Sequence, residues 1–145
     1  MYLFLKKIVF FLLLLLTSAH LPAQNKIEAT INNFENNKGL CRACLFNSAA
    51  SFEKSDPFLC LQVNVINRTA RVVFDNVPDG TYAIFVFHDA NNNNKMDKSW
   101  LGIPSEGYGA SKNKLPFAAA PKFDANKFFL SNNLNLKLNI RLRNL

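Results

Sequence analysis

Apolar and polar residues alternate along most of the chain after its first 23 positions, most strictly near the C-terminus. The sequence LNLKLNIRLR at residues 134–143 has an aliphatic side chain at every second position, with asparagine, lysine or arginine between. Successive side chains of a β-strand point to opposite faces, so this period of two predicts a strand with one buried face. The charged outer face also suits a strand at the edge of a sheet.

Turn signals separate six further runs of this kind. We predict strands at residues 26–32, 40–46, 58–66, 70–74, 81–88, 126–131 and 134–143. The run TYAIFVFH at 81–88 is apolar on both faces, which is typical of a central strand. No segment shows a convincing amphipathic helical period. The pattern therefore predicts an all-β fold, a single-domain antiparallel β-sandwich of about seven strands.

The first 23 residues have the order of a secretory signal peptide. Two lysines precede the apolar run IVFFLLLLLTSA, and HLPA follows it, ending in a small residue at Ala23. A membrane anchor is the alternative, but a spanning helix needs roughly 20 apolar residues, and the histidine and proline of HLPA interrupt the run. We expect a signal peptide at 1–23, a sandwich domain at 24–145, and a secreted or periplasmic, cell-envelope protein.

Charge narrows the classes of partner. The formal net charge is +7, and it falls to +5 without the two lysines of the signal peptide. The remaining basic residues form no dense block, whereas nucleic-acid-binding domains cluster theirs. No later segment is apolar for long enough to cross a membrane. We expect no nucleic-acid partner and no membrane span after signal cleavage; the envelope or extracellular partner and the oligomeric state are left open.

Three cysteines, Cys41, Cys44 and Cys60, lie in the expected mature chain. Export permits disulfides, and an odd number leaves one thiol over. The spacing of CRAC matches redox and zinc motifs, but it lies in a strand-like run without a second pair or a nearby histidine. If a bridge forms, the first candidate is Cys44–Cys60, with Cys41 as a buried thiol.

The sequence FHDANNNNKMDKSWLGIPSEGYG, at residues 87–109, carries the candidate chemistry. Oxygen-bearing side chains stand at every second position, at Asp89, Asn91, Asn93 and Asp97, with Lys95 between the last two. Calcium takes six to eight oxygens, and a chain that wraps it offers alternate side chains and one backbone carbonyl. The spacing therefore predicts a calcium loop with side-chain ligands at these four residues and the carbonyl of Lys95 as another.

Two details adjust this calcium prediction. The sixth loop position usually needs a left-handed backbone, which Asn94 tolerates better than most residues. The bidentate glutamate expected at the twelfth position is absent, because Trp100 stands there, and Glu106 is the candidate to fold back in its place. Neutral amide ligands should lower the affinity to about 0.1–1 mM. An asparagine-rich turn without an ion and a different cation are the alternatives.

The run SWLGIPSEGYG that follows, at residues 99–109, contains three of the five glycines of the chain. Its interleaved apolar side chains predict a long loop with a small core of its own, and such loops are often functional. The run either covers one end of the sandwich or forms a ligand surface.

Three stretches, NNKGLCRACLFNSAASF, VPDGTYAIFVFHDANNNNKMDKSWLGIPSEGYGASKN and PKFDANKFFL, together resemble the uncharacterised bacterial secreted proteins of domain-of-unknown-function family 2141. The resemblance implies an exported, single-domain sandwich of transthyretin-like or immunoglobulin-like type with no assigned activity. Family members usually have glycine where this chain has Asn94. VPDGTYAIFV is also similar to carboxypeptidase regulatory-like sandwiches, which are accessory modules rather than catalysts.

Catalysis has little support in the sequence, and no residue is predicted to be catalytic. His88 is the one histidine of the expected mature chain, and it stands next to Asp89. Neighbouring strand residues point to opposite faces, so the two side chains need not meet. We expect a non-catalytic binding or structural module with a calcium-type loop. The alternatives are a transthyretin-like carrier of a small ligand and a hydrolase that uses His88.

Overall fold

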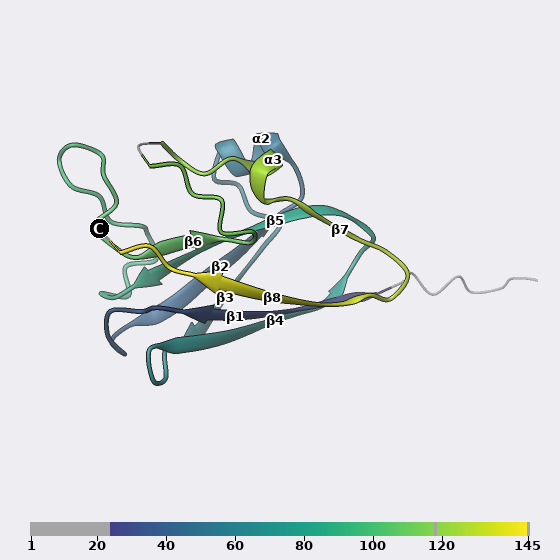
Figure 1. The fold of residues 1–145 in the computed structure, drawn as a ribbon, viewed down its shortest axis with the longest axis horizontal. Coiled ribbons are helices and arrows are strands. Elements are labelled where there is room, and N and C mark those ends of the chain that lie inside the picture. Colours follow the sequence, from purple (N-terminus) through teal and green to yellow (C-terminus); the bar gives the residue numbers. More distant parts are fainter. Residues whose placement is uncertain (1–23, 118, 145) are drawn as a thin grey trace, which may run out of the picture.

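The protein is described by a computed structural model that covers residues 24–117 and 119–144. Two sheets face each other, as the sequence predicts (Figure 1). The expected signal peptide at residues 1–23 lies outside the described residues. No helix in the described segments has the length and apolarity that crossing a bilayer requires.

The smaller sheet has three strands in the order β4-β1-β8. Its strands are β1 (Asn25–Asn32), β4 (Thr69–Val77) and β8 (Asn135–Arg141). β4 runs antiparallel to β1, whereas β8 runs parallel to it. β8 is an edge strand whose outward residues are exposed, which confirms the prediction from its alternation.

The larger sheet has the order β3-β2-β5-β6, and β7 pairs with the start of β5. Its strands are β2 (Leu40–Phe46), β3 (Leu59–Asn64), β5 (Gly80–Asp89), β6 (Tyr108–Ala110) and β7 (Phe128–Leu130). The run TYAIFVFH, which is apolar on both faces, lies in β5. β5 is an inner strand of the sheet, which confirms the prediction of a central strand. Two short helices, α2 (Ala49–Glu53) and α3 (Phe123–Asn126), lie over this sheet (Figure 1).

The core lies between the sheets. It is built from alternate side chains of both, such as Ile27 and Phe74 from one sheet and Leu45 and Ile84 from the other, all fully buried. A smaller apolar cluster on the outer face of the larger sheet includes Phe46, Phe52 and Phe123, so α2 and α3 cover one end of that face. Burial of these faces, at about 25 cal/mol per Å² of apolar surface, is the main stabilising contribution.

The structure adds three details to the predicted sandwich. The described residues contain eight strands, because Tyr108–Ala110 forms the additional short strand β6. The polar segment after β2 forms α2, whose N-cap Ser48 accepts a hydrogen bond from the amide of Ser51, and α3 was also missed. The sheets are not purely antiparallel, because β1 and β8 are parallel.

The cysteine prediction is confirmed. Cys44 and Cys60 stand directly opposite each other on β2 and β3 and form a disulfide. Cys41 is a free, fully buried thiol. Burial raises the pKa of this thiol from 9.0 to about 12.

The raised pKa of Cys41 predicts a loss of stability in alkali. Between pH 9 and pH 12 the unfolded state loses the thiol proton while the folded state keeps it. The free energy of unfolding should therefore fall as pH rises through this range, by up to about 1.4 kcal/mol per pH unit. Urea unfolding at several pH values should show a shallower fall for Cys41→Ala. Burial and the charge of Asp79 also raise the pKa of Tyr82, but this effect is the same in the parent protein and in the variant. Equal dependence of unfolding free energy on pH in the two proteins would contradict the assignment to Cys41.

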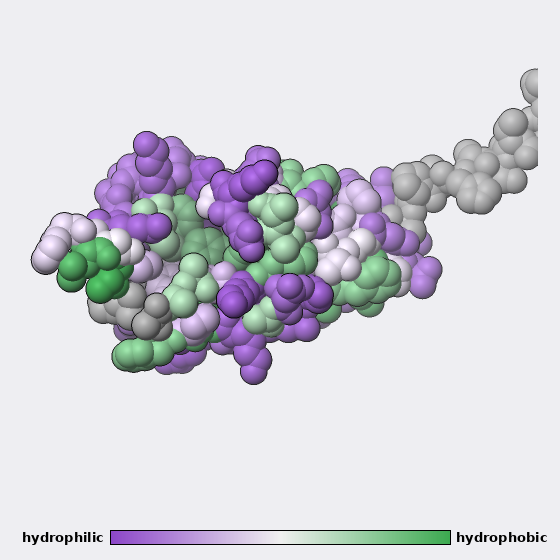
Figure 2. Space-filling view, turned by 90° about the horizontal axis from the view of Figure 1, so that it is seen from above, coloured by the Kyte–Doolittle hydropathy of each residue, from purple (hydrophilic) through white to green (hydrophobic). Residues whose placement is uncertain are grey.

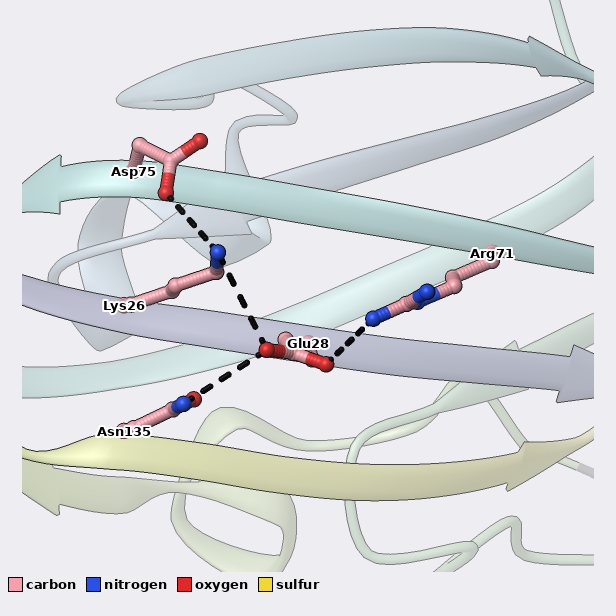
Figure 3. A network of polar contacts seen from close by, with 5 residues as sticks. All are labelled: Lys26, Glu28, Arg71, Asp75 and Asn135. Atoms are coloured by element: carbon pink, nitrogen blue, oxygen red, sulfur yellow. Dashed lines mark hydrogen bonds and ion pairs between the residues drawn. The ribbon is translucent and has the colours of Figure 1, made fainter.

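A polar network lies on the outer face of the smaller sheet (Figure 3). Glu28 on β1 is its centre: Arg71 on β4 donates to it at 2.6 Å, and Lys26 lies between Glu28 and Asp75. The hydrogen bond from Arg71 holds the pKa of Glu28 below its usual value. The network ties β1 to β4 and to Asn135 on β8 across an exposed face, where such pairs contribute modestly.

Candidate functional site

The candidate site starts where β5 leaves the larger sheet. Asp89, the last residue of β5, is fully buried and lies opposite Leu40 on β2. Gly39 packs against the backbone at this point: a Cβ added to it would lie 2.0 Å from the carbonyl oxygen of Asp89. Gly39 also has a φ of +66°, which favours glycine. The start of the loop is therefore fixed by the neighbouring chain.

The carboxylate of Asp89 organises the asparagine turn. Its Oδ1 accepts a hydrogen bond from the amide of Asn93 at 3.0 Å, and its Oδ2 accepts one from the amide of Asn94 at 2.9 Å. Asn94 has a φ of +65°, which confirms the left-handed conformation predicted for the sixth loop position. Asp89 thus folds the next five residues around its own side chain.

The two predicted amide ligands, Asn91 and Asn93, repeat this arrangement. The Oδ1 of Asn91 accepts from the amide of Asn93 at 3.1 Å, and the Oδ1 of Asn93 accepts from the amide of Lys95 at 2.8 Å. Their Nδ2 groups both donate to the carboxylate of Asp97, at 2.6 Å and 2.9 Å. Four of the predicted site residues are therefore joined in one network, while Lys95 enters it through its backbone amide.

Glu106 closes the loop from its far end. Its Oε1 accepts from the amide of Ala90 at 3.1 Å and its Oε2 from the amide of Asp97 at 3.0 Å. Glu106 therefore folds back onto the asparagine turn. Whether its carboxylate also binds a cation stays a prediction.

Two residues that the sequence prediction missed hold the turn against the larger sheet. Arg42 on β2 and Gln62 on β3 are cross-strand partners, and both donate to the Oδ1 of Asn94. The distance from the guanidinium of Arg42 to this oxygen is 3.0 Å. The signal that could have found them is their shared face: Arg42 lies on the Cys44 side of β2, and Gln62 lies on the Cys60 side of β3.

In the described part of the chain, the carboxylates of the site form no ion pair with a lysine or arginine. Within the described residues, the ion pairs closer than 4.0 Å involve Glu28, Asp75 and Asp124, and none involves Asp89, Asp97 or Glu106. The nearest compensation is the polarity of the backbone amides and the neutral asparagines. Hydrogen bonds rather than ion pairs therefore hold the three carboxylates in the loop.

The donor set fits a hard cation only in part. In the portion of the chain that the structure covers, no three His, Cys, Asp or Glu side chains come together as a metal-binding group. Amide and carbonyl oxygens would therefore have to complete the shell around one or two carboxylates. Calcium accepts such mixed oxygen shells. Each amide oxygen has two lone pairs, so Asn91 and Asn93 can each keep an N–H contact and coordinate a cation.

The structure gives His88 a packing environment. The residue is 3% exposed, its Nε2 lies 2.7 Å from the carbonyl oxygen of Lys38, and its ring packs edge-on against Phe34. Because a carbonyl oxygen only accepts, the Nε2–H of His88 is the donor in this short contact. Among the described residues, no hydrogen bond joins the side chains of His88 and Asp89.

The glycine-rich run does not form the small core that its sequence predicts. Trp100 is 92% exposed, and Leu101 and Ile103 are also exposed, whereas Tyr108 is buried in β6. Backbone hydrogen bonds shape the segment instead: the amide of Ser99 donates to Ile103 at 2.8 Å, and that of Ser105 donates to Asp97 at 2.9 Å. The run is a narrow hairpin whose apolar tip projects from the sandwich.

Fold and site together define a class: an all-β sandwich with a hydrogen-bonded acidic-amide loop at one end. Residues 29–137 match the family described as "Uncharacterized protein conserved in bacteria (DUF2141)". Because the match spans most of the chain, the protein belongs to this family, as the sequence resemblance indicates. No curated protein and no solved structure matches the chain.

Proposed function

We propose that this protein is a secreted or cell-envelope binding or structural module, without catalytic activity, whose loop at residues 89–106 binds calcium. The observation that carries the proposal is the hydrogen-bonded network that joins Asp89, Asn91, Asn93 and Asp97 in one turn. Glu106 closes this turn, and among the described residues the carboxylates of the loop have no cationic partner within 4.0 Å. The apolar N-terminal stretch with the order of a signal peptide supports export.

The backbone pattern of the loop supports calcium over a plain turn. In EF-hand loops, ligands come from the first, third, fifth, seventh and ninth positions, and the sixth takes a left-handed backbone. Here Asp89, Asn91, Asn93 and Asp97 occupy the side-chain positions, and Asn94 has the required conformation. The side-chain oxygens of Asp89, Asn91 and Asn93 accept hydrogen bonds from backbone amides further along, which holds these oxygens against the turn.

A bound calcium ion would replace the contacts that now hold Asp97. The Nδ2 groups of Asn91 and Asn93 supply partial positive charge to this carboxylate. A divalent cation between the same groups supplies far more, and the amides can turn their oxygens toward it. Calcium would then fix the start of the projecting hairpin, since Asp97 also accepts the amide of Ser105 through its carbonyl.

The proposal predicts that calcium stabilises the folded protein. At ten to a hundred times a dissociation constant of about 0.1–1 mM, binding to the folded form alone adds about 1.4–2.7 kcal/mol. For a domain of this size the thermal midpoint should rise by roughly 5–10 °C. The measurement is a thermal melt in chelator and then in excess calcium, with magnesium as the ionic control.

A pair of variants separates the loop from general charge effects. Asp97→Asn should abolish the calcium-dependent rise, because it removes one carboxylate from the site. Asp124→Asn, which changes an exposed carboxylate outside the loop, should keep it. A midpoint that is the same in chelator and in calcium would refute the calcium site and leave an asparagine turn closed by hydrogen bonds alone.

A further inference from the structure

Four strongly exposed apolar side chains lie on two neighbouring loops of the sandwich. Trp100, Leu101 and Ile103 form the tip of the hairpin after β5, and Phe117, which is 99% exposed, lies in the loop after β6. Figure 1 shows both loops on the same side of the sandwich, toward the end where the C-terminus lies. In Figure 2, a strongly hydrophobic patch lies close to the tip of that end.

Arg143 holds the bases of the two loops together. Its guanidinium donates to the carbonyl oxygens of Pro116 and Leu115, at 2.6 Å and 2.8 Å, on the approach to Phe117. Its backbone pairs with Tyr108, directly after the first loop, through hydrogen bonds of 3.0 Å and 2.8 Å. The apolar tips therefore project from a common, hydrogen-bonded base.

Basic residues are frequent in the segments that carry the apolar tips. Residues 89–122 contain five lysines against three carboxylates, and all five lysines are exposed. They are Lys95, Lys98, Lys112, Lys114 and Lys122. The three carboxylates, Asp89, Asp97 and Glu106, accept hydrogen bonds from amide groups within the loop. The formal charge of residues 89–122 is therefore +2, five lysines minus three carboxylates.

We propose that this end of the sandwich docks onto the surface of an anionic lipid bilayer. The aromatic and aliphatic tips would insert into the interfacial region, where tryptophan is favoured, while the lysines contact the headgroups. Projecting tips suit a deformable surface, because each can enter it separately, and the lysines match its negative charge. This inference deepens the proposed function by naming the partner of the binding module.

The fluorescence of Trp100 provides a direct test, because this residue is the only tryptophan in the chain. The purified protein is mixed, at saturating calcium and low salt, with vesicles of phosphatidylglycerol and phosphatidylcholine. We expect Trp100 emission to shift to shorter wavelength as the side chain leaves water. With phosphatidylcholine alone, or at high salt, the shift should require much more lipid.

Matched variants assign the contacts. Leu101→Ser should weaken binding to the anionic vesicles about tenfold, because the variant loses a leucine side chain that would be buried in the bilayer. Lys112→Gln and Lys114→Gln should each weaken it about fivefold. Phe129→Ser is the control: Phe129 is 64% exposed, close to the 62% of Leu101, but it lies on β7 opposite Thr81, at the other end of β5. Its affinity should be unchanged.

Several outcomes would overturn the lipid inference. These are an unshifted Trp100 emission with anionic vesicles, equal binding to both kinds of vesicle, or a blue shift that depends on protein concentration without lipid. The last result would assign the tips to a contact between copies of the chain. The calcium site is judged separately by the thermal melt, so failure of vesicle binding in a protein that calcium stabilises would refute the docking surface alone.

Discussion

Gly39→Ala is expected to destabilise the protein by about 2–5 kcal/mol. The added methyl group would lie 2.0 Å from the carbonyl oxygen of Asp89 and 2.6 Å from the Cα of Ala90, at a φ of +66°. The left-handed backbone costs an alanine about 1–2 kcal/mol, and overpacking against backbone that cannot move freely adds about 1–3 kcal/mol. Chemical denaturation of the variant and the parent measures the difference.

Gly102 supplies a matched control for Gly39. It also has a positive φ, of +76°, but an added Cβ would meet nothing within 4 Å. Gly102→Ala should therefore cost only the backbone term, about 1–2 kcal/mol. Equal losses in the two variants would show that the contact between Gly39 and the start of the loop is not tight, and the account of how that loop is fixed would be wrong.

Asp89→Ala should cost about 3 kcal/mol or more. It removes two hydrogen bonds from backbone amides to a charged acceptor in a fully buried residue. Such bonds contribute roughly 1.5–3 kcal/mol each. The variant should also lose the stabilisation by calcium. Denaturation with and without calcium measures both effects.

Two further variants calibrate the Asp89 result. Asp89→Asn keeps one acceptor oxygen and should cost about half as much as the alanine change. Asp75→Ala removes an exposed carboxylate that contacts Lys26 at 3.6 Å, and should change stability by about 0–1 kcal/mol. If Asp89→Ala is as mild as Asp75→Ala, the carboxylate does not organise the loop.

Patterns within one strand predicted much of this structure. The period of two in residues 134–143 predicts β8 and its exposed face, and the doubly apolar run predicts the central position of β5. The disulfide followed from the same kind of argument, because Cys44 and Cys60 lie on faces that a hairpin-like pairing brings together. These features depend on local side-chain alternation, which the sequence states directly.

Features that depend on distant pairing were missed. The parallel pairing of β1 with β8 joins the two ends of the domain, and neither strand carries a local sign of its direction. The strand β6 has three residues, which is too short to show a period, and it exists because Tyr108 pairs with Phe87. α2 begins at the cap of Ser48, in a segment whose polarity resembles a loop.

The candidate site was predicted in the same uneven way. The turn from Asp89 to Asp97 and the left-handed backbone of Asn94 could be predicted from the sequence, because the hydrogen bonds of the asparagine turn join residues that are close in sequence. The hydrogen bonds from Arg42 and Gln62 to Asn94 could not be predicted, because they depend on the register between β2 and β3. The exposed tip was mistaken for a small core because apolar composition alone does not show whether side chains have partners to pack against.

A calcium titration monitored by the NMR signals of the backbone amides tests the central claim, that calcium binds the loop at residues 89–106, most directly. The calcium-loop account predicts saturable shifts concentrated at residues 89–97 and at Glu106, with a midpoint at about 0.1–1 mM calcium, and no comparable shifts on the Glu28 network of the opposite sheet. Spectra that stay unchanged at calcium concentrations well above this range, or that change only at scattered surface residues, would contradict it.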